Sequence, residues 1–246
     1  MSHFLLDTIA GPRILLPSDD AHHATRVLRL REGDAVSGTD GQGGLVIGRL
    51  VFDPGPAIEV EQRTSVPRKQ PELSVAFALT KQSKPELVVE KLTELGVDRI
   101  VGWSAERSVV RWDRDKREQA SERFAKVAEA ALKQSRRVWL PETPPPTDLE
   151  GVCELPGTKI VFDIGAPPLG EASGPSVVVI GPEGGFTQEE LARLDRAGAV
   201  RVGLAGGVLR AETAAIAAAT LVADRLGRWM PGTQGAEPPT LAADHE

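Results

Sequence analysis

The hydrophobic pattern of this chain changes near residue 72, and this change limits the folds that it can adopt. Before that position, short apolar runs are interrupted by glycine and proline, as at 40–44 and 53–56. After it, continuous apolar runs such as 73–79 and 177–180 alternate with longer segments of helical period. Strands that alternate with helices form parallel sheets with both faces covered. The sequence therefore predicts an α/β protein in which a small β-barrel precedes an α/β domain.

The same pattern predicts the individual elements. In the first part we expect strands at 13–16, 34–39, 45–52 and 58–61, and one helix capped by Ser18 with Ala24, Val27 and Leu28 on its apolar face. In the second part we expect strands at 73–79, 100–103, 159–164, 177–180 and 200–204, and helices that include 114–134 and 211–226. Thr187 and Glu190 have the spacing of a capping box, which predicts the start of a further helix.

A polar segment with two prolines, 64–71, separates the two parts. The expected domains are therefore residues 1–66 and 72–230. The composition of residues 231–246 is typical of a disordered tail.

Composition excludes several functional classes. The single cysteine, Cys153, allows no intrachain disulfide, and His22 and His23 lack further ligands at suitable spacing, so we expect no metal. Apolar runs stay short of the roughly 20 residues that a membrane span needs, and the N-terminus lacks the features of a signal peptide. We therefore expect a cytoplasmic protein without a membrane partner. The net charge of −6 disfavours nucleic acid, yet residues 99–137 are rich in lysine and arginine, which indicates an RNA-binding face or a solvated helix.

Two glycine-rich loops carry the clearest chemical signal. Each follows an apolar strand and precedes a helix, and they comprise residues 180–187 and 203–210. In an open α/β sheet, ligands bind at the carboxyl ends of strands, and glycine lets a ligand approach the backbone. The sequence contains neither a P-loop nor a dinucleotide fingerprint after the first strand of the α/β part. Two tight turns would also explain the loops, but their similarity favours one shared ligand pocket.

These loops resemble the signature segments of the RsmE family, the bacterial 16S rRNA (uracil-N3) methyltransferases of the SPOUT class. The resemblance rests on residues 180–186 and 208–214 and on four further segments in the family's order: 22–34, 91–97, 106–110 and 134–137. Together the segments are highly specific. The resemblance implies an N-terminal PUA-like β-barrel that binds RNA, then a SPOUT α/β domain with a C-terminal trefoil knot, and a homodimer.

The resemblance also implies that the cofactor is S-adenosyl-L-methionine and that the methyl acceptor is N3 of a uridine in the 16S rRNA of the 30S subunit. The residues expected to bind the cofactor are Leu79, Ile180, Gly181, Pro182, Glu183, Gly184, Gly185, Leu204, Gly206, Val208, Leu209 and Thr213. The expected RNA contacts are Arg26, Arg29, Arg31, Arg107, Arg136 and Arg137. Because N3 of uridine carries a proton, the reaction needs a cation or a base. Arg210 is the candidate cation, and Glu183 and Glu212 are the candidate bases.

The second loop departs from the family pattern at two positions. Ala205 stands where the family usually has glycine, and Gly207 stands where it usually has arginine. The missing arginine removes one expected contact to a phosphate or to the substrate. Two alternatives therefore stay open: a SPOUT methyltransferase that acts on another RNA target, and a non-catalytic RNA-binding or ribosome-assembly factor.

Overall fold

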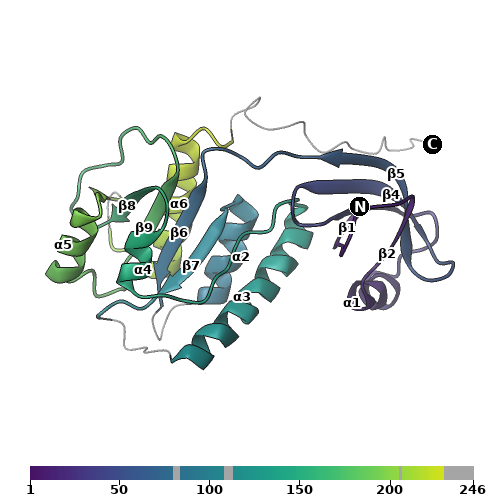
Figure 1. Cartoon of the computed structure of the whole chain (residues 1–246), viewed down its shortest axis with the longest axis horizontal. Helices are drawn as coiled ribbons and strands as arrows, with labels where there is room; N and C mark the ends of the chain where they lie inside the picture. Colours follow the sequence, from purple (N-terminus) through teal and green to yellow (C-terminus); the bar gives the residue numbers. More distant parts are fainter. Residues whose placement is uncertain (80–83, 108–112, 205–206, 230–246) are drawn as a thin grey trace. The chain divides into compact units, whose positions relative to one another are not determined.

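The computed structural model describes residues 1–79, 84–107, 113–204 and 207–229 (Figure 1). Within these residues the chain forms two compact units. The first unit contains residues 1–68 together with 132–140, and the second contains residues 69–131 together with 141–229. The tail predicted at 231–246 lies outside the described residues.

The first unit is built on one five-stranded sheet in the order β1-β3-β4-β5-β2. Its strands are β1 (Ser2–Leu5), β2 (Arg13–Leu15), β3 (Ala35–Thr39), β4 (Gly44–Val51) and β5 (Ala57–Ser65). β1 and β3 are parallel, and the other neighbours are antiparallel. A β-bulge between Ile47 and Gly48 bends β4, and a Cβ at Gly48 would lie 1.9 Å from the carbonyl oxygen of Glu59. Only glycine fits at this bend.

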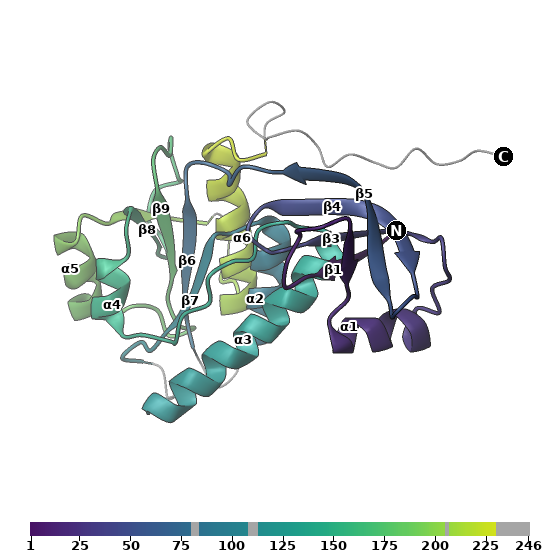
Figure 2. The same ribbon diagram turned by 45° about the vertical axis from the view of Figure 1, so that its right-hand side comes forward.

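The sheet is curled (Figure 2), and its strands contribute to an apolar core. Its buried side chains include Phe4, Leu6, Ile14, Val36, Val46, Leu50 and Ile58. The four strands predicted in this region are confirmed within a few residues at their ends. β1 was not predicted, because four residues at the chain start are too short to display a period.

The helix of the first unit differs from its prediction. α1 (Ser18–His22) continues into a π-helical turn, η1 (His23–Val27), and Pro17 rather than Ser18 occupies the N-cap position. Ala24 is buried as predicted, but Val27 and Leu28 are 61% and 41% exposed. A π-helical turn holds more residues than an α-helical turn, so it rotates the following side chains away from the face that the α-helical period predicts. The predicted apolar face is therefore wrong at Val27 and Leu28.

Two polar contacts hold the segment that joins the first unit from the middle of the chain. Nε2 of the buried His3 lies 3.1 Å from the carbonyl oxygen of Arg137, and Nδ1 lies 2.8 Å from the hydroxyl of Ser37. A carbonyl only accepts, so Nε2 carries the proton and Nδ1 accepts from Ser37 in the neutral ring. Nζ of Lys133 lies 2.7 Å from the carboxylate of the buried Asp20.

The first unit is expected to lose stability as the pH falls below 6.5, the ordinary pKa of histidine. Burial, aided by the charge of Arg136, lowers the pKa of His3, against a hydrogen bond to Arg137 that raises it. The unfolded chain therefore binds a proton that the folded chain does not, and the stabilisation present above pH 6.5 is lost as the pH falls toward the folded pKa. Urea unfolding at a series of pH values measures this loss. The variant His3→Gln should show a weaker dependence, and an equal dependence in both proteins would contradict the role of His3.

The second unit contains a parallel five-stranded sheet in the order β10-β8-β9-β6-β7. The strands are β6 (Leu73–Ala78), β7 (Arg99–Trp103), β8 (Thr158–Phe162), β9 (Ser176–Ile180) and β10 (Val200–Val202). All five were predicted, with small differences at their ends. Every residue of β6 and β9 is buried, which explains why these strands read as continuous apolar runs.

Helices cover both faces of this sheet (Figure 1). They are α2 (Pro85–Leu95), α3 (Arg114–Ser135), α4 (Leu149–Glu154), α5 (Gln188–Arg196) and α6 (Ala211–Arg225). α4 and α5 share a buried cluster with Val177 and Val179 of β9, whereas α2 contacts α6, and α6 contacts β6 and β9. α4 was not predicted, because six residues are too few for a helical period.

None of the helices within the described residues combines the length and the apolar character needed to cross a membrane.

Candidate active site

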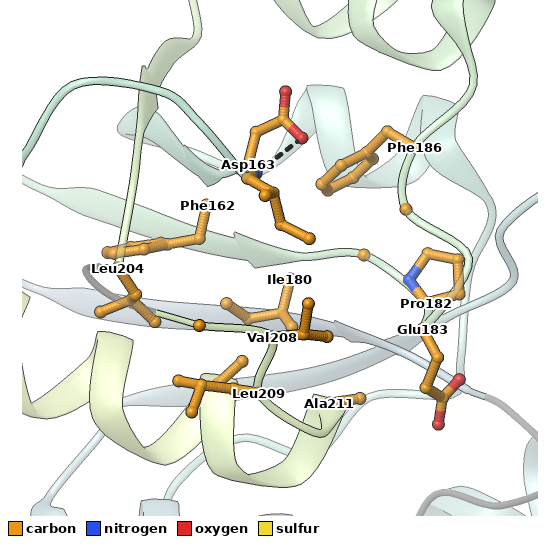
Figure 3. A pocket seen from close by; sticks show the side chains of 15 residues that line it. Phe162, Asp163, Ile180, Pro182, Glu183, Phe186, Leu204, Val208, Leu209 and Ala211 are labelled. Carbon is orange, nitrogen blue, oxygen red and sulfur yellow. Dashed lines mark hydrogen bonds between the residues drawn. The ribbon is translucent and has the colours of Figure 1, made fainter.

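A pocket lies at the carboxyl ends of the neighbouring strands β8 and β9, beside the start of α6 (Figure 3). Its empty space of about 650 Å³ includes the open solvent at its mouth. The lining residues are Phe162, Asp163, Ile164, Ile180, Gly181, Pro182, Glu183, Gly185, Phe186, Leu204, Gly207, Val208, Leu209, Ala211 and Ala214. Both predicted glycine-rich loops therefore contribute to one pocket.

An aromatic stack determines one wall of the pocket. The ring of Phe186 stacks on Trp103 of β7, with centroids 5.9 Å apart and planes inclined by 13°. The indole N–H of Trp103 donates to the carbonyl of Ile180 at 3.0 Å. A Cβ at Gly181 would lie 2.8 Å from the nearest ring carbon of Phe186, which is closer than real Cβ contacts. The first loop therefore needs glycine at 181 because an aromatic ring lies against its backbone.

A partly buried hydrogen-bond network joins the first loop to the segment that follows β7. The carboxylate of Glu190 is 5% exposed and accepts from the backbone N–H groups of Glu106 and Thr187, each at 2.8 Å. The hydroxyl of Thr187 accepts from the N–H of Glu190 and donates to the carboxylate of Glu106 at 3.0 Å. The predicted capping box is thus confirmed. Arg107 adds a bond from Nη1 to the carbonyl of Gly184 at 2.6 Å.

The segment after β8 brings a carboxylate to the pocket. The carboxylate of Asp163 accepts from the N–H of Ile164 at 3.0 Å, and the Asp163 N–H donates to the carbonyl of Val202 at 2.9 Å. The second loop passes close by, since a Cβ at Gly203 would lie 2.4 Å from the carbonyl oxygen of Ala166. This close approach brings two lining segments together that are distant in sequence.

Some lining residues were not among those predicted to bind the cofactor. They are Phe162, Asp163, Ile164, Phe186, Gly207, Ala211 and Ala214. A signal existed for the first three, because they end a predicted buried strand and ligands bind at the carboxyl ends of such strands. Phe186 belongs to the first loop, but only its stacking on Trp103 shows that its ring forms a wall.

Most of the predicted cofactor residues line this pocket. They are Ile180, Gly181, Pro182, Glu183, Gly185, Leu204, Val208 and Leu209. Three others lie elsewhere: Leu79 is buried close to Gly102, and Gly184 and Thr213 are exposed and not part of the lining. Gly206, like Ala205, lies outside the described residues.

The three predicted catalytic residues lie in or beside the lining segments. Glu183 lines the pocket. Arg210 is exposed and occupies the N-cap position of α6, directly after the lining residue Leu209. Glu212 lies in the first turn of α6, next to the lining residue Ala211. Arg210 and Glu212 are thus adjacent to the lining in sequence without forming it.

The predicted RNA contacts are divided between the two units. Arg26, Arg29, Arg31, Arg136 and Arg137 belong to the first unit, and Arg107 belongs to the second. All except the half-buried Arg137 are exposed. Arg29 and Arg136 have left-handed backbone conformations, with φ of 53° and 54°.

The lining combines apolar side chains with two acidic residues. Ile180, Val208 and Leu209 are among the apolar residues, and Asp163 and Glu183 are the acidic ones. Apolar side chains bury the faces of a planar ring, and carboxylates accept hydrogen bonds from hydroxyl or ammonium groups. Such a site suits a nucleoside that carries a positive charge. Within the described residues, no group of three or more His, Cys, Asp or Glu side chains is placed to hold a metal ion.

Family models and curated relatives match almost the whole chain. A model described as an RNA methyltransferase domain matches residues 67–223, and one described as an RNA methyltransferase PUA domain matches residues 16–60. The ribosomal RNA small subunit methyltransferase E of Mycobacterium bovis is 34% identical, with 92% of each chain covered. The protein of the same name from Bacillus subtilis is 29% identical and covers 86% of this chain and 90% of its own.

Solved structures share the fold. The ribosomal RNA small subunit methyltransferase E of Neisseria gonorrhoeae, bound to S-adenosyl methionine, is similar with a TM-score of 0.79 and 26% identity over 91% of this chain and 97% of that one. A probable rRNA-methyltransferase from Porphyromonas gingivalis has a TM-score of 0.77 and 28% identity over 92% and 99%. The family predicted from the glycine loops is confirmed, and the chain belongs to the ribosomal RNA small subunit methyltransferase E family.

Proposed function

We propose that this protein transfers the methyl group of S-adenosyl-L-methionine to N3 of a specific uridine in the 16S rRNA of the small ribosomal subunit. The pocket built from both glycine-rich loops carries the proposal, in a family whose Neisseria gonorrhoeae member binds this cofactor. The choice of N3 rests on the resemblance of the two loops to the uracil-N3 enzymes. A ribosomal substrate implies a cytoplasmic location and the 30S subunit as the partner.

The lining of the pocket fits S-adenosylmethionine. Ile180, Val208 and Leu209 would hold the adenine ring, and the carboxylate of Asp163 would accept hydrogen bonds from ribose hydroxyls. The bound cofactor supplies a methyl group that its sulfonium charge activates. Gly207, where relatives usually have arginine, lines the pocket, and no atom lies within 4 Å of the position of a Cβ there. The substitution therefore leaves the pocket open, which favours the catalytic function over the non-catalytic alternative.

The remaining task of the protein is to prepare the uridine. N3 is a poor nucleophile until its proton leaves, so a base must accept this proton or a cation must stabilise the resulting anion. The guanidinium of Arg210 would stabilise the anion, and the carboxylate of Glu183 or Glu212 would accept the proton. The protein also accelerates the reaction by holding N3 of the uracil ring in line with the methyl group of the cofactor.

Replacing Arg210 by alanine is expected to lower kcat by about a hundredfold while the Kd for the cofactor changes by less than about threefold. The reason is that Arg210 follows the pocket lining rather than forming part of it. Single-turnover methylation measures the rate, and calorimetry measures the Kd. Arg210→Lys keeps the charge and should retain part of the activity. Equal rates in the wild type and Arg210→Ala would exclude the proposed role.

The remaining features follow from the same resemblance. We propose that residues 1–66 form a PUA-like barrel, that residues 72–230 form a SPOUT domain with a C-terminal trefoil knot, and that two chains form a homodimer. Arg26, Arg29, Arg31, Arg107, Arg136 and Arg137 would contact RNA phosphates. The exposure of most of these arginines supports this assignment. Phosphate contacts release counterions, so binding should weaken steeply as salt rises.

The proposed function is tested with labelled S-adenosylmethionine and 30S subunits from a strain that lacks the enzyme. Label recovered as 3-methyluridine in 16S rRNA is the expected result. Label in another nucleoside would show that the protein is a methyltransferase with a target other than N3 of uridine. Absence of both label and cofactor binding would favour the non-catalytic RNA-binding factor.

A further inference from the structure

An exposed apolar pair lies between two arginines at the end of η1. Val27 is 61% exposed and Leu28 is 41% exposed, and the flanking Arg26 and Arg29 are exposed as well. Side chains this apolar usually lie in the core, and an apolar surface within a charged rim is typical of a binding site. We call these four residues, 26–29, the helix-end patch.

Backbone hydrogen bonds hold the patch in one conformation. The N–H of Leu28 donates to the carbonyl of His23 at 3.0 Å, and the N–H of Leu30 donates to the carbonyl of Ala24 at 3.0 Å. Ala24 is fully buried in the core of the first unit, so its packing fixes the turn to the rest of the unit. Arg29 closes the turn with a φ of 53°, a conformation that residues other than glycine seldom adopt. The exposure of Val27 and Leu28 therefore belongs to an ordered turn.

The charges around the patch indicate the chemistry of its partner. Within the described residues, the guanidinium groups of Arg26, Arg29 and Arg31 have no hydrogen bond or ion pair, so their charge is available to a ligand. The nearby carboxylate of Asp34 accepts from the backbone N–H of Arg31 at 2.7 Å, and that of Asp20 pairs with Lys133. Asp19 and Glu32 are exposed acidic residues of the same segment, but residues 26–29 themselves include two arginines and no acidic residue. The patch thus offers positive charge beside apolar surface, which complements a polyanion with exposed apolar faces.

We propose that the helix-end patch binds unpaired nucleotides of the RNA substrate, with the arginines on the phosphates and Val27 and Leu28 against the faces of bases. This inference rests on the proposed function, which makes RNA the substrate. Bases in a duplex are stacked and hide their faces, whereas bases in loops and bulges are open to side chains. Apolar contact with the base faces adds affinity that phosphate contacts alone do not supply. The patch would therefore bind an unpaired RNA segment more tightly than an RNA duplex.

The experiment compares the full-length wild type with Val27→Ser/Leu28→Ser in binding to a fluorescent single-stranded RNA and to a duplex RNA of equal length, over a range of salt. We expect the double variant to bind the single strand about tenfold more weakly, because contacts to base faces are lost. Its salt dependence should equal that of the wild type, because no phosphate contact is lost. Its affinity for the duplex should change by less than about twofold.

Two controls separate this effect from others. Leu15→Ser removes another exposed apolar side chain of the first unit, 60% exposed on β2, and should bind both RNAs as the wild type does. Arg26→Gln should weaken binding to both RNAs and reduce the salt slope by about one phosphate contact. Thermal unfolding followed by circular dichroism checks that each variant folds.

Four outcomes would overturn the inference. The first two are that the double variant binds the single strand as tightly as the wild type, or that it loses affinity for both RNAs equally. A smaller sedimentation mass of the double variant, with RNA binding intact, would assign the patch to a second copy of the chain. If the wild type bound neither RNA and methylated no 30S subunit, the proposed function would fail together with the inference, and this result is distinct from the other outcomes.

Discussion

Replacing Gly181 by alanine is expected to weaken the binding of S-adenosylmethionine by about one to two orders of magnitude, while the protein still folds. The added Cβ would lie 2.8 Å from the ring of Phe186. The ring is stacked on Trp103 at 5.9 Å, so it has little room to retreat toward β7. The clash must instead move the ring of Phe186 or the backbone of the first loop around Gly181, and both line the pocket. Calorimetric titration with the cofactor measures the loss.

Gly170 provides a matched control, because no atom lies within 4 Å of the position of a Cβ there and it does not line the pocket. Gly170→Ala makes the same chemical change in the same unit and should bind the cofactor with an affinity within about twofold of the wild type. If Gly181→Ala also bound within this range, the contact between glycine and the ring would not control the shape of the pocket.

Replacing Arg228 by alanine is expected to lower the free energy of unfolding by about 3–5 kcal/mol. Arg228 is 2% exposed and lies 2.9 Å from the carboxylate of Asp98, itself 7% exposed. Its guanidinium also donates to the carbonyls of Gly96 at 2.8 Å and of Pro71. Loss of the side chain would leave a buried carboxylate without its cation, although the N–H of Leu73 still donates to it at 2.8 Å. Urea unfolding measures the change.

Two comparisons test this explanation. Arg225→Ala removes an exposed arginine at the end of α6 and should change the free energy of unfolding by less than about 0.5 kcal/mol. In the double variant Arg228→Ala/Asp98→Ala the unpaired charge is gone, so the loss should be smaller than the sum of the two single losses. Additive losses would show that Arg228 stabilises the protein through its carbonyl contacts rather than through the ion pair.

The parallel sheet could be predicted because burial on both faces leaves a local signal. Each residue of β6 and β9 is buried, so each strand appears in the sequence as an uninterrupted apolar run. The capping box at Thr187 and Glu190 is equally local, since its two residues bond to each other's backbone. The same reasoning failed for α4, because its six residues complete fewer than two helical turns.

The pocket was predicted in part. The two glycine-rich loops indicated a shared pocket, because glycine marks places where the backbone makes a close approach. The family resemblance then named eight of the residues that line it. Asp163 and Phe186 were missed, because their roles depend on contacts with Val202 and Trp103, which come from other strands. The end of a predicted buried strand marked the position of Asp163, but only the structure shows that this residue lines the pocket.

The sequence by itself determined the succession of strands and helices along the second unit apart from α4, the two glycine-rich loops and the family, because each depends on residues that are close together in the chain. Only the tertiary structure decided that residues 132–140 join the first unit and that Val27 and Leu28 are exposed. The first rests on long-range contacts such as the hydrogen bonds of His3 with Arg137 and of Trp139 with Val66. The second rests on a π-helical turn, in which Ala24 is buried in the core and the side chains that follow are rotated outward. Long-range packing of this kind leaves no periodic signal, so it is visible only once the chain has folded.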